Sequence, residues 1–206
     1  GKAERHETSI VGPIFRSVIP IGSLRLAAWG VGSGSALKDH QSPIDILLIS
    51  DFRVSEYPRN NREVPLNPWI EGFLMLLRHF TCLAEELKHL RFAIALATPP
   101  GNPQELSCER TFYRQRVPRH VKLLERRDAF CSYDALSRAQ LVLTGQSTMG
   151  LESLSLGKKT VIVTPVMTEF LMRLGVSHQP WALGSVGYTH FKRSVEQLLK
   201  QPVEDF

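Results

Sequence analysis

The chain has 206 residues, of which 43% are hydrophobic and 22% charged, and its formal net charge is +5. This length and apolar content suit one large domain or two small ones with a packed core, and they exclude a largely disordered chain. The mild basicity is compatible with an anionic small ligand, with nucleic acid or with an anionic membrane face, and also with an ordinary solvated surface.

Cysteine and histidine usage gives no sign of a metal site. Cys82, Cys108 and Cys131 are widely spaced without a C-x-x-C pair, and the seven histidines form neither H-x-x-x-H nor H-E-x-x-H. We therefore expect buried free thiols in a reducing compartment, and neither a metal nor another cofactor. No apolar run reaches the length of a membrane span and no signal peptide is visible, so we expect a cytoplasmic protein.

The first 43 residues precede the predicted domain. Residues 1–9 are polar and begin with Gly rather than Met, which predicts a disordered start derived from a tag. Residues 10–43 contain a short apolar run broken by Gly12-Pro13 and a glycine-rich stretch at 30–35. No helical pattern follows those glycines, so we interpret them as a flexible loop rather than as a phosphate-binding fingerprint.

From residue 44 onward, apolar strands alternate with helical patterns. The run 44–50 predicts a buried strand with Asp51 and Arg53 at its tip. Over 69–90 apolar residues recur every three or four positions, which predicts a helix with Trp69 and Phe73 in the core. Further strands are expected at 92–97, 121–125, 141–144 and 160–164, and helices at about 105–114, 134–139, 149–156, 170–174 and 191–199. The alternation predicts an α/β domain over 44–206, a Rossmann-like parallel sheet flanked by helices.

The most informative stretch, residues 141–163, has the pattern of strand, polar turn, short helix, glycine and strand. The turn follows a strand, so it lies at the carboxyl edge of the sheet, where open α/β sheets bind ligands. A hydroxyl cap leaves amide groups and the positive end of the helix dipole for an anion, and glycines let a phosphate approach the backbone. The expected nucleotide contacts in this turn are Gly145, Gln146, Ser147, Thr148 and Gly150.

Glu152 lies about one helical turn beyond these hydroxyls. A capping box would need an acidic residue three positions after Ser147 or Thr148, where the chain has Gly150 and Leu151. Glu152 therefore lacks that structural role, and its carboxylate suits the hydroxyls of a ribose. The alternative is an ordinary N-cap followed by a solvated glutamate.

The run from Ser147 to Glu152, followed by Gly157-Lys158-Lys159, resembles the donor-site signature of GT-B glycosyltransferases, closest to bacterial transferases of capsule or lipopolysaccharide type. The resemblance implies two facing Rossmann-like domains, of which the carboxyl-terminal one holds a nucleotide-sugar. Ser147 and Thr148 would then contact phosphates, and Glu152 a ribose or donor sugar. No metal is implied at this site.

Residues 10–16 are similar to the segment that leads into the second domain of many GT-B enzymes. This likeness implies that residues 10–43 come from a missing amino-terminal acceptor domain and that Arg16 lines the cleft between the domains. Asp51 and Arg53 would face the same cleft, and Arg127 would approach the base or phosphate. Solvated surface charge is the alternative for Arg16 and Arg127.

The function expected from this resemblance is donor binding for the transfer of a sugar to a surface polysaccharide or glycolipid. The partners would be the nucleotide-sugar, the missing acceptor domain and, peripherally, the inner membrane, with no nucleic acid. The general base of GT-B enzymes usually comes from the amino-terminal domain, so this chain would bind a donor without turning it over, and no catalytic residue is assigned. Two alternatives stay open, a GT-B-like UDP-N-acetylglucosamine 2-epimerase and a noncatalytic phosphate- or nucleic-acid-binding module.

Overall fold

The computed structural model describes residues 28, 43–52, 68–128, 130–145, 147–163 and 181–202. The chain divides into two compact units, 1–34 and 35–206, and all the helices and strands given below belong to the second. Several predictions lie outside the described residues: the start at 1–9, most of the lead-in segment at 10–43, the helix at 170–174, and Arg16, Arg53 and Gln146.

The described strands form one parallel sheet in the order β3-β2-β1-β4-β5-β6. The strands are β1 (Ile44–Ile49), β2 (Phe92–Ala95), β3 (Lys122–Leu124), β4 (Ala139–Thr144), β5 (Lys159–Val163) and β6 (Ala182–Leu183). Five of them fall where the apolar runs predict them, whereas the two-residue β6 is too short for a sequence pattern. The Rossmann-like α/β fold expected from the alternation is confirmed.

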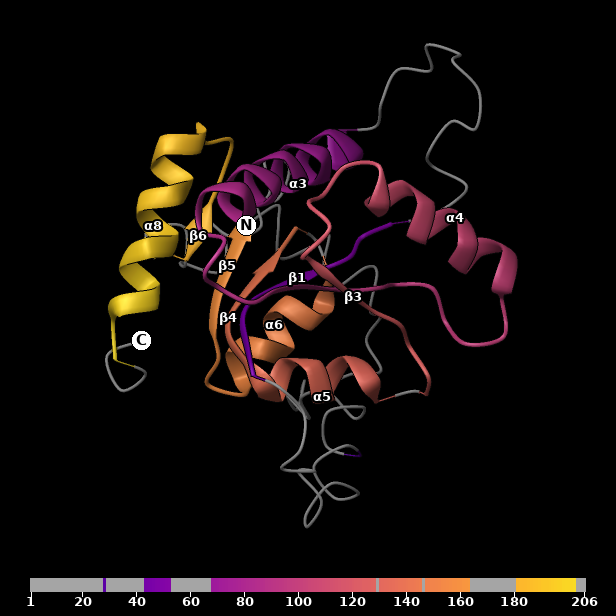
Figure 1. The fold of residues 1–206 in the computed structure, drawn as a ribbon. Helices are drawn as coiled ribbons and strands as arrows, with labels where there is room; N and C mark the ends of the chain where they lie inside the picture. The colour runs from indigo at the N-terminus through magenta and orange to yellow at the C-terminus, as the bar shows by residue number, and fades with distance from the viewer. Residues whose placement is uncertain are drawn as a thin grey trace, which may run out of the picture. The chain divides into compact units, whose positions relative to one another are not determined.

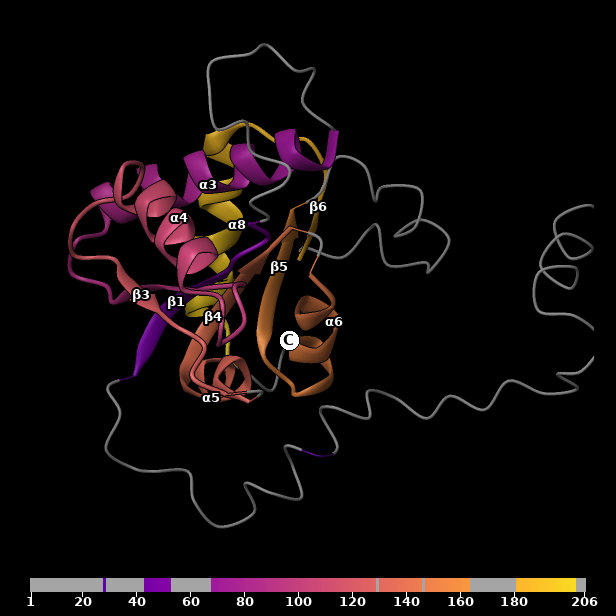
Figure 2. The same ribbon diagram turned by 90° about the vertical axis from the view of Figure 1, so that its right-hand side faces the viewer.

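Helices cover both faces of the sheet (Figures 1 and 2). They are α3 (Pro68–Glu86), α4 (Pro103–Arg114), α5 (Cys131–Arg138), α6 (Thr148–Ser155) and α8 (Tyr188–Lys200). Helices α3, α4 and α8 lie on one face, and α5 and α6 lie on the other. None of these helices is long and apolar enough to cross a membrane.

The main core lies between the sheet and the first of these layers. Alternate strand residues such as Ile46 and Leu48 pack there with the buried stripe of α3, which includes Phe73 and Phe80. Fully buried Phe191 of α8 joins the same cluster. Strands β1, β4 and β5 are buried on both faces, which explains their nearly continuous apolar sequence.

Two predictions about burial are wrong in part. Phe73 is in the core, but Trp69 is 38% exposed because it lies in the first turn of α3, beside the buried stripe. All three cysteines are free as predicted, yet Cys82 and Cys108 are exposed and Cys131 is half-buried. Cys82 and Cys108 lie on solvent-facing positions of α3 and α4, so their thiols are not core groups.

Candidate functional site

The strand order reverses between β1 and β4, which places the crevice typical of ligand binding at their carboxyl ends. Asp51 follows β1, and Gly145 follows β4. A Cβ atom on Gly145 would lie 2.6 Å from Oδ2 of Asp51. The Asp51 carboxylate therefore sits against the backbone of Gly145, and the fold brings together two residues that are far apart in the sequence.

Helix α6 begins directly on the end of β4 because Gly150 has no side chain. A Cβ atom there would lie 2.4 Å from Cγ2 of Thr144, the last residue of β4. Thr144 is fully buried, and its Oγ1 has no hydrogen-bond partner among the described residues. Gly150 thus allows α6 to pack closely against β4. The Thr144 hydroxyl lies beneath the helix without a described hydrogen-bond partner.

The N-terminus of α6 is capped by a neutral hydroxyl. Ser147 is the N-cap, in extended conformation, and its Oγ accepts a hydrogen bond of 3.3 Å from the backbone N–H of Met149. Thr148 is the first residue of the helix, and the first turn contains no acidic residue. By contrast, the first turns of α3, α4 and α5 contain Glu71, Glu105 and Asp134. No acidic residue in the first turn of α6 offsets the partial positive charge at its N-terminus. This helix end can therefore attract an anion.

Glu152 has a structural partner that the sequence did not reveal. Its Oε2 accepts a 2.9 Å hydrogen bond from the hydroxyl of Tyr133, a fully buried residue of α5. The Glu152 side chain is half-buried, so this bond ties α5 to the second turn of α6. The capping-box argument excludes one structural role for Glu152, but the carboxylate has another.

Lys158, part of the sequence signature, lies at the far end of α6 from Ser147. Gly157, with φ of 67°, ends the helix, and the N–H of Lys158 donates to the carbonyl of Ser153. The Lys158 Nζ donates 2.6 Å to the carbonyl of Ser137, and burial lowers its pKa. This lysine therefore holds α6 against the end of α5 and does not reach the turn.

Arg127 is exposed at the end of β3 and lines a cavity of about 320 Å³ beside α5. β2 and β1 lie between β3 and β4, so three strand spacings, about 14 Å, separate Arg127 from the α6 turn. Its neighbour Arg126 turns toward β2, where NH1 donates 3.2 Å to the carbonyl of Ala97 and the buried Nε has no described partner. The fold thus groups Asp51 with the turn but keeps Arg127 away from it.

The N-terminus of α5 is occupied by a carboxylate of the chain itself. Oδ1 of Asp128 accepts hydrogen bonds from the backbone N–H groups of Phe130 (2.6 Å) and Cys131 (3.0 Å), and the Cys131 thiol donates to Oδ2 at 3.2 Å. The hydrogen bond from Phe130, followed by that from the thiol, holds the pKa of Asp128 below its ordinary value.

A buried carboxylate fixes the loops that follow β1 and β2. Glu109 of α4 is fully buried and accepts hydrogen bonds from the N–H groups of Ala97 (2.8 Å) and Thr98 (2.9 Å). It also accepts a 2.6 Å bond from Ser50, whose Oγ in turn accepts one from Tyr113. This network ties the loops after β1 and β2 to α4 beside Asp51. Sequence reasoning missed it because a single glutamate in a polar helix carries no signal of burial.

Among the residues that the structure describes, no group of three or more His, Cys, Asp or Glu side chains could hold a metal ion.

Comparison with known proteins gives one family and a distant structural likeness. The sequence model of a family described as "putative O-antigen biosynthesis protein" matches residues 14–173, more than half of the chain. No curated protein matches. A crystal structure of a "putative UDP-N-acetylglucosamine 2-epimerase" from Listeria monocytogenes is similar at a TM-score of 0.48 and 13% identity. The match covers 85% of this chain and 44% of that one, so the chain spans less than half the length of that protein.

Proposed function

Because the chain belongs to the family described as putative O-antigen biosynthesis proteins, we propose that it is the donor-binding half of a GT-B glycosyltransferase. It binds a nucleotide-sugar at the α6 turn and serves in the transfer of the sugar to a surface polysaccharide or glycolipid. The acceptor is held by an amino-terminal domain of the same type. Residues 10–43 lead in from that domain, and the enzyme works in the cytoplasm, peripherally at the inner membrane.

The observation that carries this proposal is the N-terminus of α6, capped by a neutral hydroxyl at the point where the strand order reverses. The turn has a neutral hydroxyl cap at Ser147, and the Asp51 carboxylate lies against the backbone of Gly145 beside it. Its first turn contains no acidic residue. A phosphate group matches the cap and the helix end, since it needs N–H donors and a positive dipole.

In sugar transfer, the bond between the anomeric carbon and the donor phosphate breaks, and negative charge develops on the leaving phosphate. Amide groups of the α6 N-terminus would stabilise that charge without rearranging, because the helix is already seated on β4 through Gly150. Asp51, beside Gly145, can accept hydrogen bonds from ribose or sugar hydroxyls. Glu152 can do the same while it holds the Tyr133 hydroxyl, because a carboxylate has several acceptor positions.

The test is a titration of the chain with CMP, UDP and GDP by calorimetry, together with NMR of the backbone amides around Ser147. We expect one of the nucleotides to bind and to shift those amides. The variant Ser147→Asp keeps an N-cap but adds a negative charge, so its affinity should fall by at least about tenfold, the equivalent of 1.4 kcal/mol.

The matched control is Asn102→Asp, which makes the same charge change at the N-cap of α4. Its affinity should stay within about twofold of the unmodified chain, because salt screens charges that lie a Debye length away. Failure of the folded chain to bind any of the three nucleotides would overturn the proposal, and so would equal losses in the two variants. Turnover of UDP-N-acetylglucosamine without an acceptor would replace sugar transfer by 2-epimerisation.

A further inference from the structure

A second cavity, of about 350 Å³, lies at the amino edge of the sheet, opposite the α6 turn. It is formed where β1, β2 and β3 begin and where α3, α4 and α5 have ended. Basic side chains surround it: Lys88, His89, Arg91, His120, Lys122 and Arg138. None of the described residues that line this cavity is acidic.

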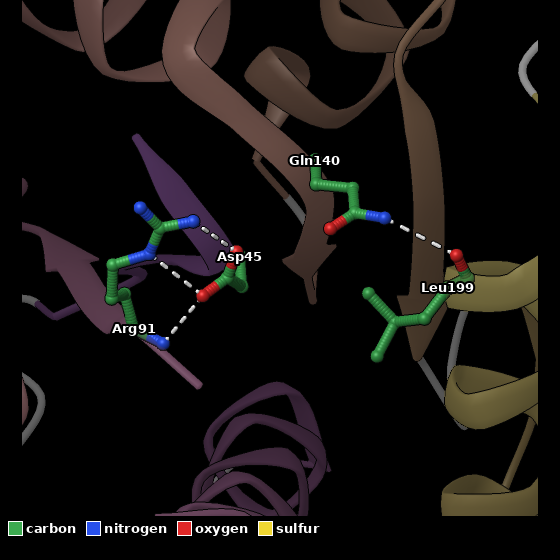
Figure 3. A network of polar contacts seen from close by, with 4 residues as sticks. All are labelled: Asp45, Arg91, Gln140 and Leu199. Atoms are coloured by element: carbon green, nitrogen blue, oxygen red, sulfur yellow. Dashed lines mark hydrogen bonds and ion pairs between the residues drawn. The ribbon is translucent and has the colours of Figure 1, made fainter. Parts of the chain in front are cut away.

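The nearest acidic group is already neutralised. Asp45, at the start of β1, accepts hydrogen bonds from the Arg91 guanidinium at 2.7 and 2.9 Å and from the Arg91 backbone N–H at 2.7 Å (Figure 3). This pairing holds the pKa of Asp45 below its ordinary value and raises that of Arg91. Arg91 and Asp45 cancel each other, which leaves Lys88 and Lys122 as the lysines at the cavity that have no ion-pair partner among the described residues.

Helix dipoles account for only part of this charge. Basic residues are expected in the last turns of helices that end at the amino edge, and Arg114, Arg138 and Lys200 hold those positions in α4, α5 and α8. Lys88 and Lys122 lie outside any last turn. Neither forms a hydrogen bond or ion pair with another described residue, and both are exposed.

The floor of the cavity is apolar, with Ile44 and Phe92 both buried. The His120 ring meets Phe92 edge-on at a centroid distance of 6.3 Å. A cavity with an apolar floor and a rim of unpaired ammonium groups, anchored by one guanidinium, suits an anion of more than one charge carried on an organic group.

We propose that this amino-edge cavity binds a phosphate group carried on an organic molecule, either a phospholipid headgroup or a soluble phosphate ester. Lys88 and Lys122 supply mobile positive charge, and Arg138 supplies a fixed guanidinium, held through its Nε–H to the carbonyl of Asp134 at 3.2 Å. The site is independent of the donor site, because the two lie at opposite edges of the sheet.

The test uses the full 206-residue chain and two probes. Vesicles of phosphatidylcholine with 30% phosphatidylglycerol, against pure phosphatidylcholine, probe a headgroup, and glycerol 1-phosphate probes a soluble ester. Vesicle binding is measured by co-sedimentation. Ester binding is measured by NMR of the amides near Phe92 and Lys122, which are separate from the amides of the α6 turn.

The variant is Lys88→Glu with Lys122→Glu, and its matched control is Arg78→Glu with Arg193→Glu. The control makes the same change in net charge at exposed positions of α3 and α8 outside the cavity. We expect binding of at least one probe, and the cavity variant should bind it at least about tenfold more weakly. The control should bind nearly as well as the unmodified chain, with unfolding temperatures equal in all three proteins.

The probe that binds identifies the source of the phosphate. Equal losses in the variant and the control would overturn the site, because they would show a general charge effect. Binding of neither probe would overturn it as well. Either result would leave nucleotide binding at the α6 turn unaffected, so failure here is distinct from failure of the proposed function.

Discussion

The N-termini of α5 and α6 lie on the same face and at the same edge of the sheet, but the chain treats them differently. The α5 terminus receives the carboxylate of Asp128 as an internal anion. The α6 terminus receives the neutral hydroxyl of Ser147. The comparison teaches that the capacity for an external anion depends on whether a helix end is capped by a carboxylate or by a neutral hydroxyl, since every helix end carries the same dipole.

The largest expected effect comes from displacing α6 from the end of β4. In Gly150→Ala the new Cβ would lie 2.4 Å from Cγ2 of the buried Thr144. The free energy of unfolding should fall by about 2 kcal/mol, even after the ~1 kcal/mol that alanine gains over glycine in a helix. Chemical denaturation measures the loss. If Gly150→Ala displaces α6 from β4, the affinity for the nucleotide should fall together with the stability.

Adding Thr144→Ser removes Cγ2 and should restore most of the stability lost in Gly150→Ala. Gly187→Ala is the matched control because no atom lies within 4 Å of its new Cβ, and its cost should stay below about 1 kcal/mol. A Gly150→Ala variant as stable as the unmodified chain would show that α6 does not depend on this close packing.

The next effect concerns the link between the two helices. Tyr133→Phe removes the hydroxyl that donates to Glu152, and we expect a loss of about 1.5 kcal/mol in the free energy of unfolding because the acceptor is charged. Glu152→Gln keeps an acceptor for that hydroxyl and should cost less. If Glu152 also binds a sugar hydroxyl, Glu152→Gln weakens binding of a nucleotide-sugar more than binding of the nucleotide alone. Equal stability of Tyr133→Phe and the unmodified chain would contradict the structural link.

The hydrogen bond between Tyr133 and Glu152 is a contact that the sequence could not predict, whereas other features could be predicted. Strands and helices were predictable because buried parallel strands are apolar on both faces and α3 has a regular stripe. The N-cap at Ser147 and the glycine stop at Gly157 were predictable because they depend on neighbouring residues only. The approach of Asp51 to Gly145 followed in outline from parallel strands that share one edge.

Side-chain contacts between separate helices and strands could not be predicted from the sequence. Tyr133 and Glu152 lie 19 positions apart on different helices, and neither pattern nor spacing pairs them. Glu109 belongs to a polar helix, yet it is fully buried and bonded to the loops that follow two strands. The family resemblance implies that Arg127 approaches the base or phosphate, but the residues around Arg127 do not give its distance from the α6 turn. The strand order, which separates them by β2 and β1, is a property of the whole sheet.

A smaller effect is expected from removing the internal anion of α5. Asp128→Ala should lower the free energy of unfolding by about 1 kcal/mol, the usual cost of losing a helix cap. Nucleotide affinity should not change, because α6 and not α5 receives the phosphate. A loss of affinity comparable to that of Ser147→Asp would break the distinction between the two termini. Calorimetry with the nucleotide that binds the unmodified chain measures the affinity.

The smallest effect is the pH dependence of that same cap. The pKa of Asp128 is lower in the folded chain than its ordinary value, so the folded state favours the charged form. Its contribution to stability is therefore complete above the ordinary value of about 4 and is lost as the pH falls through the folded pKa. The difference in unfolding free energy between the unmodified chain and Asp128→Ala should be constant near neutral pH and shrink in acid. At low pH the Asp128 carboxyl group becomes neutral, as the Ser147 hydroxyl at the α6 terminus is at every pH. A difference that grows as the pH falls would have the wrong sign for a carboxylate that caps α5.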